Sequence, residues 1–277
     1  MENKILQLNN LTNGLHFLSL GGIGEIGANC YLYGCDGKWI MIDLGLSFAD
    51  EKFPGVDLLV PKIDHIDSIQ DNLEAIIISH GHEDHAGAVA FFANKIKCPV
   101  YATKFAKLLI ENRLKEFNKN EGFILNELSL DEELILNNFK LSFIPTTHSI
   151  PEPSAIVIQT SYGSLLHTAD WKIDKSPTLG NSFSTHEFEK IGNEGLLALI
   201  GDSTNANVPG TSKSENDVRE ELTKIFSRFS NRIVVTCFSS NIARMKNIIY
   251  AAKKNKRKVA LVGRSMKKNI ESAKKCG

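Results

Sequence analysis

Short apolar runs separated by turn residues fill the first part of the chain. LHFLSL at 15–20 and EAIIIS at 74–79 are apolar, and the second is rich in β-branched residues, which favours buried strands. Two more runs, CYLYG and KWIMIDLG, flank Asp36-Gly37, a pair typical of a tight hairpin turn. The pattern therefore predicts strands, many of them antiparallel neighbours.

Helical periodicity interrupts these strands. HAGAVAFFANKI at 85–96 follows the second run, and TKFAKLLIENRLKEF at 103–117 is amphipathic. CPVYAT is strand-like, and further strand-like runs follow in FKLSFIPTTHS, SAIVIQTSYGSLLHTAD and LLALIGDST. This order predicts an α/β domain in which two sheets pack together with helices outside.

The end of the chain follows a different pattern. RIVVTCF at 232–238 and KVALVG at 258–263 are strand-like, and a helical stretch follows each of them. Strand, helix, strand and helix in this order predict a parallel βαβ unit, so we expect a domain boundary near residue 205. A segment of about 70 residues is small for a hydrophobic core of its own. We therefore expect a truncated front part of a longer protein, with an apolar sheet edge exposed.

Composition is typical of a globular protein, with 42% hydrophobic and 23% charged residues. No apolar run approaches the roughly 18 residues that a membrane span needs, and the N-terminus lacks the apolar core of a signal peptide. The five cysteines are scattered and form no CxxC pair, which favours reduced thiols over disulfides or a cysteine zinc site. A cytoplasmic protein without a membrane segment is expected.

The charges are divided unevenly along a chain of zero net charge. Residues 206–277 contain 17 Lys/Arg and 5 Asp/Glu, whereas residues 1–205 contain 15 and 27. Such asymmetry indicates a polyanionic partner for the basic segment. A solvated helix face is the alternative for a single run such as KKNKRK at 253–258.

A glycine pattern near the N-terminus resembles a dinucleotide-binding fingerprint. Gly22, Gly24 and Gly27 have the spacing G-x-G-x-x-G after a predicted strand. That site requires a helix next, but ANCYLYG is strand-like. We expect these glycines to let the backbone turn tightly beside a metal site or its substrate.

Three of the eight histidines lie within six positions, directly after the run that ends at Ser79. His80-Gly-His82-Glu-Asp84-His85 has the pattern H-x-H-x-D-H, on a loop between a predicted strand and a predicted helix. Imidazole is the commonest metal-binding side chain, and a carboxylate adds negative charge for a divalent cation. His80 and His82 alternate on an extended turn and can converge on one ion, while Asp84 and His85 point elsewhere and can hold a second. A polar loop with chance histidines is the alternative, which the regular spacing disfavours.

More ligands are expected from the ends of distant strands. His148 in PTTHSIPEP and Asp170 in LLHTADW both follow apolar runs, at positions where side chains leave a sheet. The other histidines lack such a context: His167 is predicted to be a strand residue, and His16, His65 and His186 are predicted to be surface residues.

Several segments resemble a known family. The histidine cluster, Asp43 in IDLG, and the later THS and TADW resemble the metallo-β-lactamase fold. A closer similarity, to the ribonuclease J family of the β-CASP group, is carried in order by GGIGEIGANCYLY, SHGHEDHAGAV, PTTHSIPEPSAIVI, IGDSTNANVPG, FSSNIARM and VGRSM. In that family a β-CASP domain is inserted into the metallo-β-lactamase domain. The resemblance implies a metallo-β-lactamase αββα sandwich in 1–204, lacking its returning C-terminal strands, and the first part of a parallel α/β β-CASP domain in 205–277.

The resemblance also implies roles for individual residues. One zinc ion would be held by His80, His82 and His148, the other by Asp84 and His85, and Asp170 would bridge the two. Asp43 would orient the histidine loop, although a strand-end turn explains it equally well. Catalytic roles are expected for Asp84 and Asp202, and contacts to RNA are expected for Ser203, Thr204, Ser239 and Arg264.

The implied function is hydrolysis of RNA phosphodiesters in rRNA processing and mRNA decay. The family combines endonuclease cutting with 5′-to-3′ trimming of 5′-monophosphorylated RNA, and its full-length chains form dimers or tetramers. Two divalent cations about 3.5–4 Å apart can lower the pKa of a shared water towards about 7, and the resulting hydroxide attacks phosphorus. Zn²⁺ is expected, with Mn²⁺ or Mg²⁺ as alternatives.

The chain also departs from the family pattern. The family takes another metal-binding histidine and a phosphate-contacting histidine from sequence beyond the β-CASP insertion, so the second ion is expected to be weakly held here. Three rival functions stay open: a non-catalytic RNA- or metal-binding remnant, another hydrolase of this fold that acts on a thioester, lactone or β-lactam, and a DNA nuclease of the wider β-CASP group. The basic second segment disfavours the other hydrolase.

Overall fold

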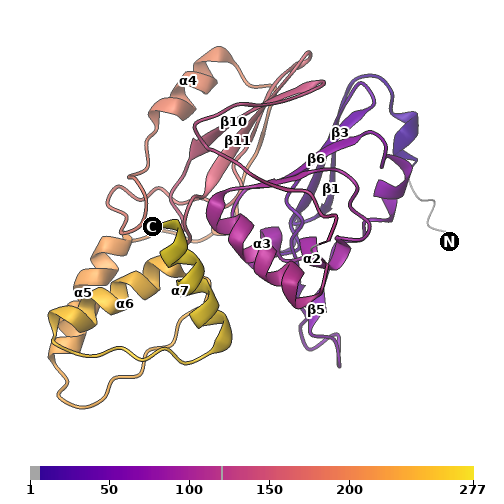
Figure 1. Ribbon diagram of the computed structural model, residues 1–277. Helices are drawn as coiled ribbons and strands as arrows, with labels where there is room; N and C mark the ends of the chain where they lie inside the picture. The colour runs from indigo at the N-terminus through magenta and orange to yellow at the C-terminus, as the bar shows by residue number, and fades with distance from the viewer. Residues whose placement is uncertain (1–6, 120) are drawn as a thin grey trace.

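The computed structural model describes residues 7–119 and 121–277. Within these residues, two large β-sheets pack face to face with helices on their outer surfaces, and the C-terminal helices form a separate group (Figure 1). The predicted sandwich of two sheets between helices is confirmed.

The first sheet is mixed. Its strand order is β1-β2-β3-β6-β7-β8. The strands are β1 (Leu15–Gly21), β2 (Cys30–Cys35), β3 (Lys38–Ile42), β6 (Leu73–Ile78), β7 (Val100–Ala102) and β8 (Leu125–Glu127). The pairs β1–β2 and β2–β3 are antiparallel, and the others are parallel. Asp36 and Gly37 have positive φ angles of 46° and 79°, as a type I′ turn requires, so the predicted hairpin is confirmed.

The second sheet is mainly antiparallel, in the order β13-β12-β11-β10-β9. Its strands are β9 (Leu134–Leu136), β10 (Phe139–Pro145), β11 (Ser154–Thr160), β12 (Gly163–His167) and β13 (Ala198–Ile200), and β13 runs parallel to β12. The short strands β4 (Ser47–Phe48) and β5 (Leu58–Leu59) pair separately, and 3₁₀ turns occur at η1 (Leu8–Asn10) and η2 (Asp64–Ser68).

The alternating direction of side chains along β6 explains how the layers form. Ala75 and Ile77 pack between the sheets, and Ile76 and Ile78 pack on the helical side, because successive strand residues point to opposite faces. The helical side of the first sheet carries α2 (Val89–Phe92) and α3 (Lys104–Glu116), and the outer side of the second sheet carries α4 (His186–Glu194) (Figure 1).

The helix predicted over 85–96 is divided into α1 (Glu83–Ala86) and α2. The amide of Ala88 donates to the carbonyl of Leu44, and the carbonyl of His85 accepts from the amide of Leu44. Both groups would otherwise belong to the helical hydrogen-bond ladder. A distant loop therefore interrupts the helix, which the local sequence does not reveal.

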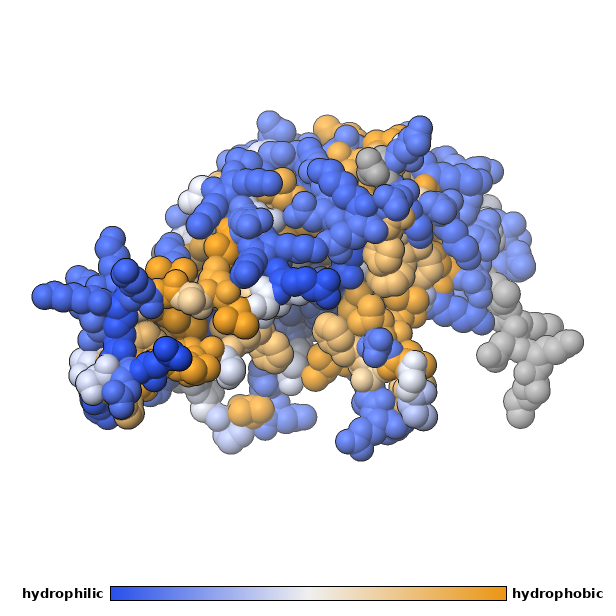
Figure 2. Space-filling view, turned by 60° about the horizontal axis from the view of Figure 1, so that its bottom comes forward, coloured by the Kyte–Doolittle hydropathy of each residue, from blue (hydrophilic) through white to orange (hydrophobic). Residues whose placement is uncertain are grey.

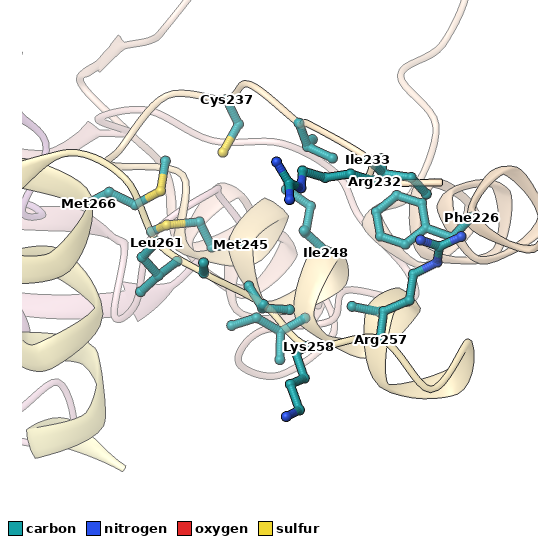
Figure 3. Close-up of a pocket in the computed structure, with 15 residues that line it drawn as sticks. Phe226, Arg232, Ile233, Cys237, Met245, Ile248, Arg257, Lys258, Leu261 and Met266 are labelled. Atoms are coloured by element: carbon teal, nitrogen blue, oxygen red, sulfur yellow. The ribbon is translucent and has the colours of Figure 1, made fainter. Parts of the chain in front are cut away.

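The two strands predicted at 232–238 and 258–263 are not formed. Both segments are extended, but neither belongs to a sheet of the described residues, which contain the helices α5 (Glu215–Ser227), α6 (Ile242–Lys254) and α7 (Arg264–Cys276). A strand requires a neighbour that accepts and donates its backbone hydrogen bonds. The two segments instead border a cavity of about 380 Å³ that apolar residues of α6 and several basic side chains also line (Figure 3).

Apolar side chains are exposed in the two C-terminal extended segments and near strand β13. Val234, Phe238 and Val262 are 83%, 83% and 86% exposed, and apolar patches lie among charged side chains on the side that carries the C-terminal helices (Figure 2). On β13, an edge of the second sheet, Leu199 is 63% exposed, and Leu197, directly before this strand, is 59% exposed. Apolar residues are thus exposed near the β13 edge, and such edges invite pairing with further β-structure. The absence of returning strands stays a prediction.

A search of the described helices for a membrane span found none of sufficient length and apolarity.

Candidate metal centre

Three loops meet at one end of the sandwich. The histidine loop leaves the carboxyl end of β6, His148 follows β10, and Asp170 follows β12. Strands β10 and β12 run in the same direction, because both are antiparallel to β11, so their carboxyl ends share an edge. The topology thus brings His80 and Asp170, which are 90 positions apart in sequence, to the same place.

The first donor group contains His80, His82, His148 and Asp170. His82 Nδ1 lies 3.0 Å from His80 Nε2 and 3.1 Å from His148 Nε2, and His148 Nε2 lies 3.6 Å from Asp170 Oδ2. A tetrahedral zinc ion with Zn–N distances of about 2.05 Å would set its donors roughly 3.3 Å apart. The spacing of these donors therefore fits a single ion.

The second donor group contains Asp84, His85 and Asp170. His85 Nε2 lies 3.2 Å from Asp170 Oδ1 and 3.5 Å from Asp84 Oδ2. Asp170 thus directs one carboxylate oxygen towards each group. The arrangement matches two adjacent cation sites that share a carboxylate.

The protonation states of the first group suit a cation. Burial lowers the pKa of His80, His82 and His148, and that of His82 falls to about 3, so the three rings are neutral and offer lone pairs. Burial alone would raise the pKa of Asp170, but its hydrogen bond with His85 and the neighbouring histidines lower it. Neutral nitrogen donors beside an ionised carboxylate are a typical zinc ligand set.

His85 behaves differently in the absence of an ion. Burial works against its charge, but Asp43 and Asp170 raise the pKa of His85 above its usual value. Its Nδ1 lies 2.6 Å from Asp43 Oδ2, so Nδ1–H donates to that carboxylate and Nε2 faces the second group. A cation bound there would replace the proton on Nε2.

Asp43 supports the histidine loop through buried hydrogen bonds. It is fully buried, its Oδ1 accepts from the amide of Ser79 at 2.8 Å, and its Oδ2 accepts from the Ser79 hydroxyl at 2.9 Å. Its φ of 61° is in the left-handed region, which aspartate tolerates better than most residues. A Cβ on Gly45 would stand 1.6 Å from the carbonyl oxygen of Asp84, so only glycine fits at this close approach.

Asn29 is a residue of the site that sequence reasoning missed. Its Nδ2 lies 3.0 Å from the Asp84 carbonyl oxygen and 3.1 Å from His85 Nε2, and its Oδ1 accepts from the Tyr31 hydroxyl at 2.8 Å. The sequence feature that could have revealed Asn29 is its position at the end of the glycine-rich segment GGIGEIGANC. No helix follows that segment, so the structure lacks the feature a dinucleotide site needs, in agreement with the prediction.

A cleft of about 750 Å³ opens beside the second group. Asp202, Ser203 and Thr204 line it together with His85 and Asp170. Asp202 Oδ1 accepts from the amide of Thr204 at 2.9 Å and from its hydroxyl at 2.6 Å, so the acid orders its own loop. These three residues therefore lie beside the second donor group, and their predicted catalytic role and contacts with RNA stay predictions.

The other predicted RNA contacts lie outside this cleft. The Ser239 carbonyl accepts from Asn269 Nδ2 at 2.7 Å, and Arg264 is exposed at the start of α7. Neither residue lines the cleft, and their predicted contacts with RNA stay predictions.

The remaining histidines stay out of both donor groups. His167 ends β12 as predicted, and its Nδ1 pairs with the Tyr33 hydroxyl at 2.9 Å. His186 is exposed as predicted, whereas His16 and His65 are half-buried.

Acid should destabilise the fold partly through His167. Burial lowers its pKa to about 4, whereas an unfolded histidine has a pKa of about 6.5. The unfolded state therefore binds the proton first, and the stability that His167 contributes is present above pH 6.5 and lost as the pH falls towards 4. The full loss is about 3 kcal/mol. Urea unfolding between pH 7 and pH 4.5, with a chelator present, should show a shallower decline for His167→Gln; equal slopes would contradict this.

The comparisons with known proteins agree with this geometry. Residues 23–186 match the family model described as "Metallo-beta-lactamase superfamily". That stretch is more than half of the chain and contains both donor groups. The chain belongs to the metallo-beta-lactamase superfamily. Beyond the superfamily match, residues 230–277 match the model described as "Ribonuclease J, beta-CASP domain".

Curated relatives of this superfamily member are similar over nearly all of its length. It is 41% identical to Ribonuclease J of Sinorhizobium meliloti, with 95% of this chain and 47% of that protein covered. It is 35% identical to Ribonuclease J2 of Bacillus subtilis, with 96% and 48% covered. The chain therefore spans about half the length of the curated relatives it matches.

One solved structure shows the fold alone. A protein of unknown function from Enterococcus faecalis superposes with a TM-score of 0.60 at 17% identity, covering 87% of this chain and 67% of that one.

Proposed function

We propose that this chain belongs to a metal-dependent ribonuclease that hydrolyses RNA phosphodiesters in RNA processing and decay. The observation that carries the proposal is the convergence of two donor groups on Asp170 beside an open cleft. The names of the curated relatives support RNA as the substrate, as does the match of residues 230–277 to the ribonuclease J β-CASP domain.

The donor set favours zinc. Imidazole nitrogens suit Zn²⁺ and other transition metals, whereas Mg²⁺ prefers oxygen ligands, so Mn²⁺ is the better alternative to zinc. His80, His82, His148 and Asp170 would hold one ion, and Asp84, His85 and Asp170 the other. When bound, such ions lower the pKa of water and neutralise charge on a phosphate.

The acidic residues of the cleft would handle proton transfer during RNA hydrolysis. Burial raises the pKa of Asp84, so this carboxyl takes up a proton more readily than an exposed aspartate. Asp202 lines the same cleft, and its own loop donates hydrogen bonds to it. We propose that Asp84 relays a proton at the attacking side, and that Asp202 positions the RNA or assists the leaving oxygen.

The basic segment 206–277 would attract the RNA backbone. Its 17 Lys/Arg against 5 Asp/Glu give a positive surface next to an otherwise acidic sandwich. Such attraction is sensitive to salt, because bound phosphates release counterions. Preference for a 5′-monophosphate, both endonuclease and 5′-to-3′ exonuclease action, a cytoplasmic location, and dimers or tetramers of the longer protein are part of this proposal.

A second candidate is binding of RNA or metal without turnover. It is favoured by one observation: the chain spans about half the length of its curated relatives.

One assay separates these functions. The chain is incubated with a 5′-monophosphorylated RNA and Zn²⁺ or Mn²⁺, with and without EDTA, beside Ribonuclease J of Sinorhizobium meliloti as the active control. We expect metal-dependent cleavage that weakens with salt. RNA and metal binding without cleavage would favour the second candidate, and turnover of nitrocefin or a thioester instead of RNA would contradict the ribonuclease proposal.

A further inference from the structure

His82 uses its two ring nitrogens on opposite sides. Its Nδ1 faces the first donor group, at 3.0 Å from His80 Nε2 and 3.1 Å from His148 Nε2. Its Nε2 faces away and lies 3.2 Å from Ser149 Oγ. A hydrogen bond to Ser149 on the Nε2 side bears on which nitrogen of His82 carries the proton.

Ser149 lies where the metal-binding loops contact the first turn of α6. It follows His148 directly, and its carbonyl accepts from the amide of Ala243 in the first turn of α6 at 3.1 Å. Its neighbour Ile150 packs with Phe105 of α3 and Ile242 of α6. The metal loops and the start of the C-terminal helices thus meet at one serine.

His80 and His85 obtain such support within the sandwich. Ser79 Oγ lies 3.0 Å from His80 Nδ1, and Asp43 accepts from His85 Nδ1. The support of His82, in contrast, comes from Ser149, whose carbonyl also accepts from the amide of Ala243 in α6. The C-terminal helices therefore have a direct route to a ligand of the first group.

We propose that Ser149 is a positioning residue for His82: its hydroxyl accepts from Nε2–H, fixes the tautomer that leaves Nδ1 free, and couples the docking of α6 to the affinity of the first metal site. The proposal rests on the metal centre of the proposed function and extends it. Partners of this kind typically change metal affinity about 10–100-fold when they are removed.

The test separates the hydroxyl from the backbone contact. Ser149→Ala removes Oγ but keeps the carbonyl that holds α6, and Ser149→Thr restores a hydroxyl. Ser161→Ala is the matched control, because Ser161 lies in the exposed turn between β11 and β12, at the opposite end of the sheet. Circular dichroism and thermal unfolding confirm that each variant folds.

The first measurement needs no metal. Ring ¹⁵N chemical shifts of the metal-free protein should place the proton of His82 on Nε2 in the native chain and in Ser149→Thr, and give a tautomer mixture in Ser149→Ala. An unchanged tautomer in Ser149→Ala would overturn the positioning role, whether or not the chain is a nuclease.

The second measurement is the Kd for Co²⁺, with the visible bands of bound Co²⁺ as the signature of ligand geometry. We expect Kd to rise about ten-fold or more in Ser149→Ala, with altered bands, and to stay near the native value in Ser149→Thr and Ser161→Ala. A Kd within about two-fold of native in Ser149→Ala would overturn the coupling to metal affinity. A native chain that binds no Co²⁺ would overturn the metal centre itself, and this coupling with it.

The third variant tests coupling through α6. Ile242→Ala touches no ligand but loosens the contact with Phe105 and Ile150. We expect it to weaken Co²⁺ binding several-fold while leaving Ser149 intact. An unchanged affinity in Ile242→Ala would show that docking of α6 is not coupled to the site.

Discussion

Replacing Asp170 with alanine should remove RNA hydrolysis and most metal binding together. Asp170 is the one residue that belongs to both donor groups of the described chain, at 3.2 Å from His85 Nε2 and 3.6 Å from His148 Nε2. Its loss leaves each group with fewer donors and without the shared negative charge. Since loss of an outer support alone costs about 10–100-fold, we expect the rate to fall by more than about a hundred-fold.

The measurement combines metal content after dialysis with cleavage of a 5′-monophosphorylated RNA. Asp170→Asn keeps the shape but not the charge, and should retain some binding at the first group, where nitrogen donors dominate. Asp131→Ala, at an exposed turn, is the matched control and should change neither quantity. If Asp170→Ala retained native metal content, the shared site would be refuted.

Among the substitutions proposed for this chain, Asp43→Ala should cause the largest loss of unfolding free energy. The carboxylate is completely buried and accepts from the Ser79 amide, the Ser79 hydroxyl and His85 Nδ1. Alanine would leave a buried amide unpaired and His85 without its partner. Breaking a buried charged pair in this way costs about 3–5 kcal/mol of unfolding free energy.

Chemical denaturation in the presence of a chelator measures this loss without a contribution from bound metal. Asp43→Asn keeps one oxygen for the Ser79 amide and should lose less. In the double variant with His85→Ala, the two losses should not add, because the residues interact directly. A change below about 1 kcal/mol for Asp43→Ala would mean that Asp43 acts only as a strand-end turn.

Much of the site could be predicted from local sequence. The spacing of His80, His82, Asp84 and His85 depends on one short loop, so neighbouring residues suffice to recognise it. His148 and Asp170 were found because side chains at strand ends leave the sheet and can meet at a common edge. Asn29 and Ser149 were missed because their contacts join segments that are 55 and 67 positions apart in sequence.

The same distinction applies to the fold. Alternation along β6 and the Asp36-Gly37 turn specify a two-faced strand and a hairpin by themselves, because side-chain direction and positive φ are local properties. The break between α1 and α2 and the unpaired segments 232–238 and 258–263 depend on which distant backbone groups are near enough to bond. The sequence by itself determined the two-faced strand β6, the hairpin at Asp36-Gly37 and the metal-binding residue types. The tertiary structure alone decided which nitrogen of each histidine faces inward, because that choice depends on partners brought together only by folding.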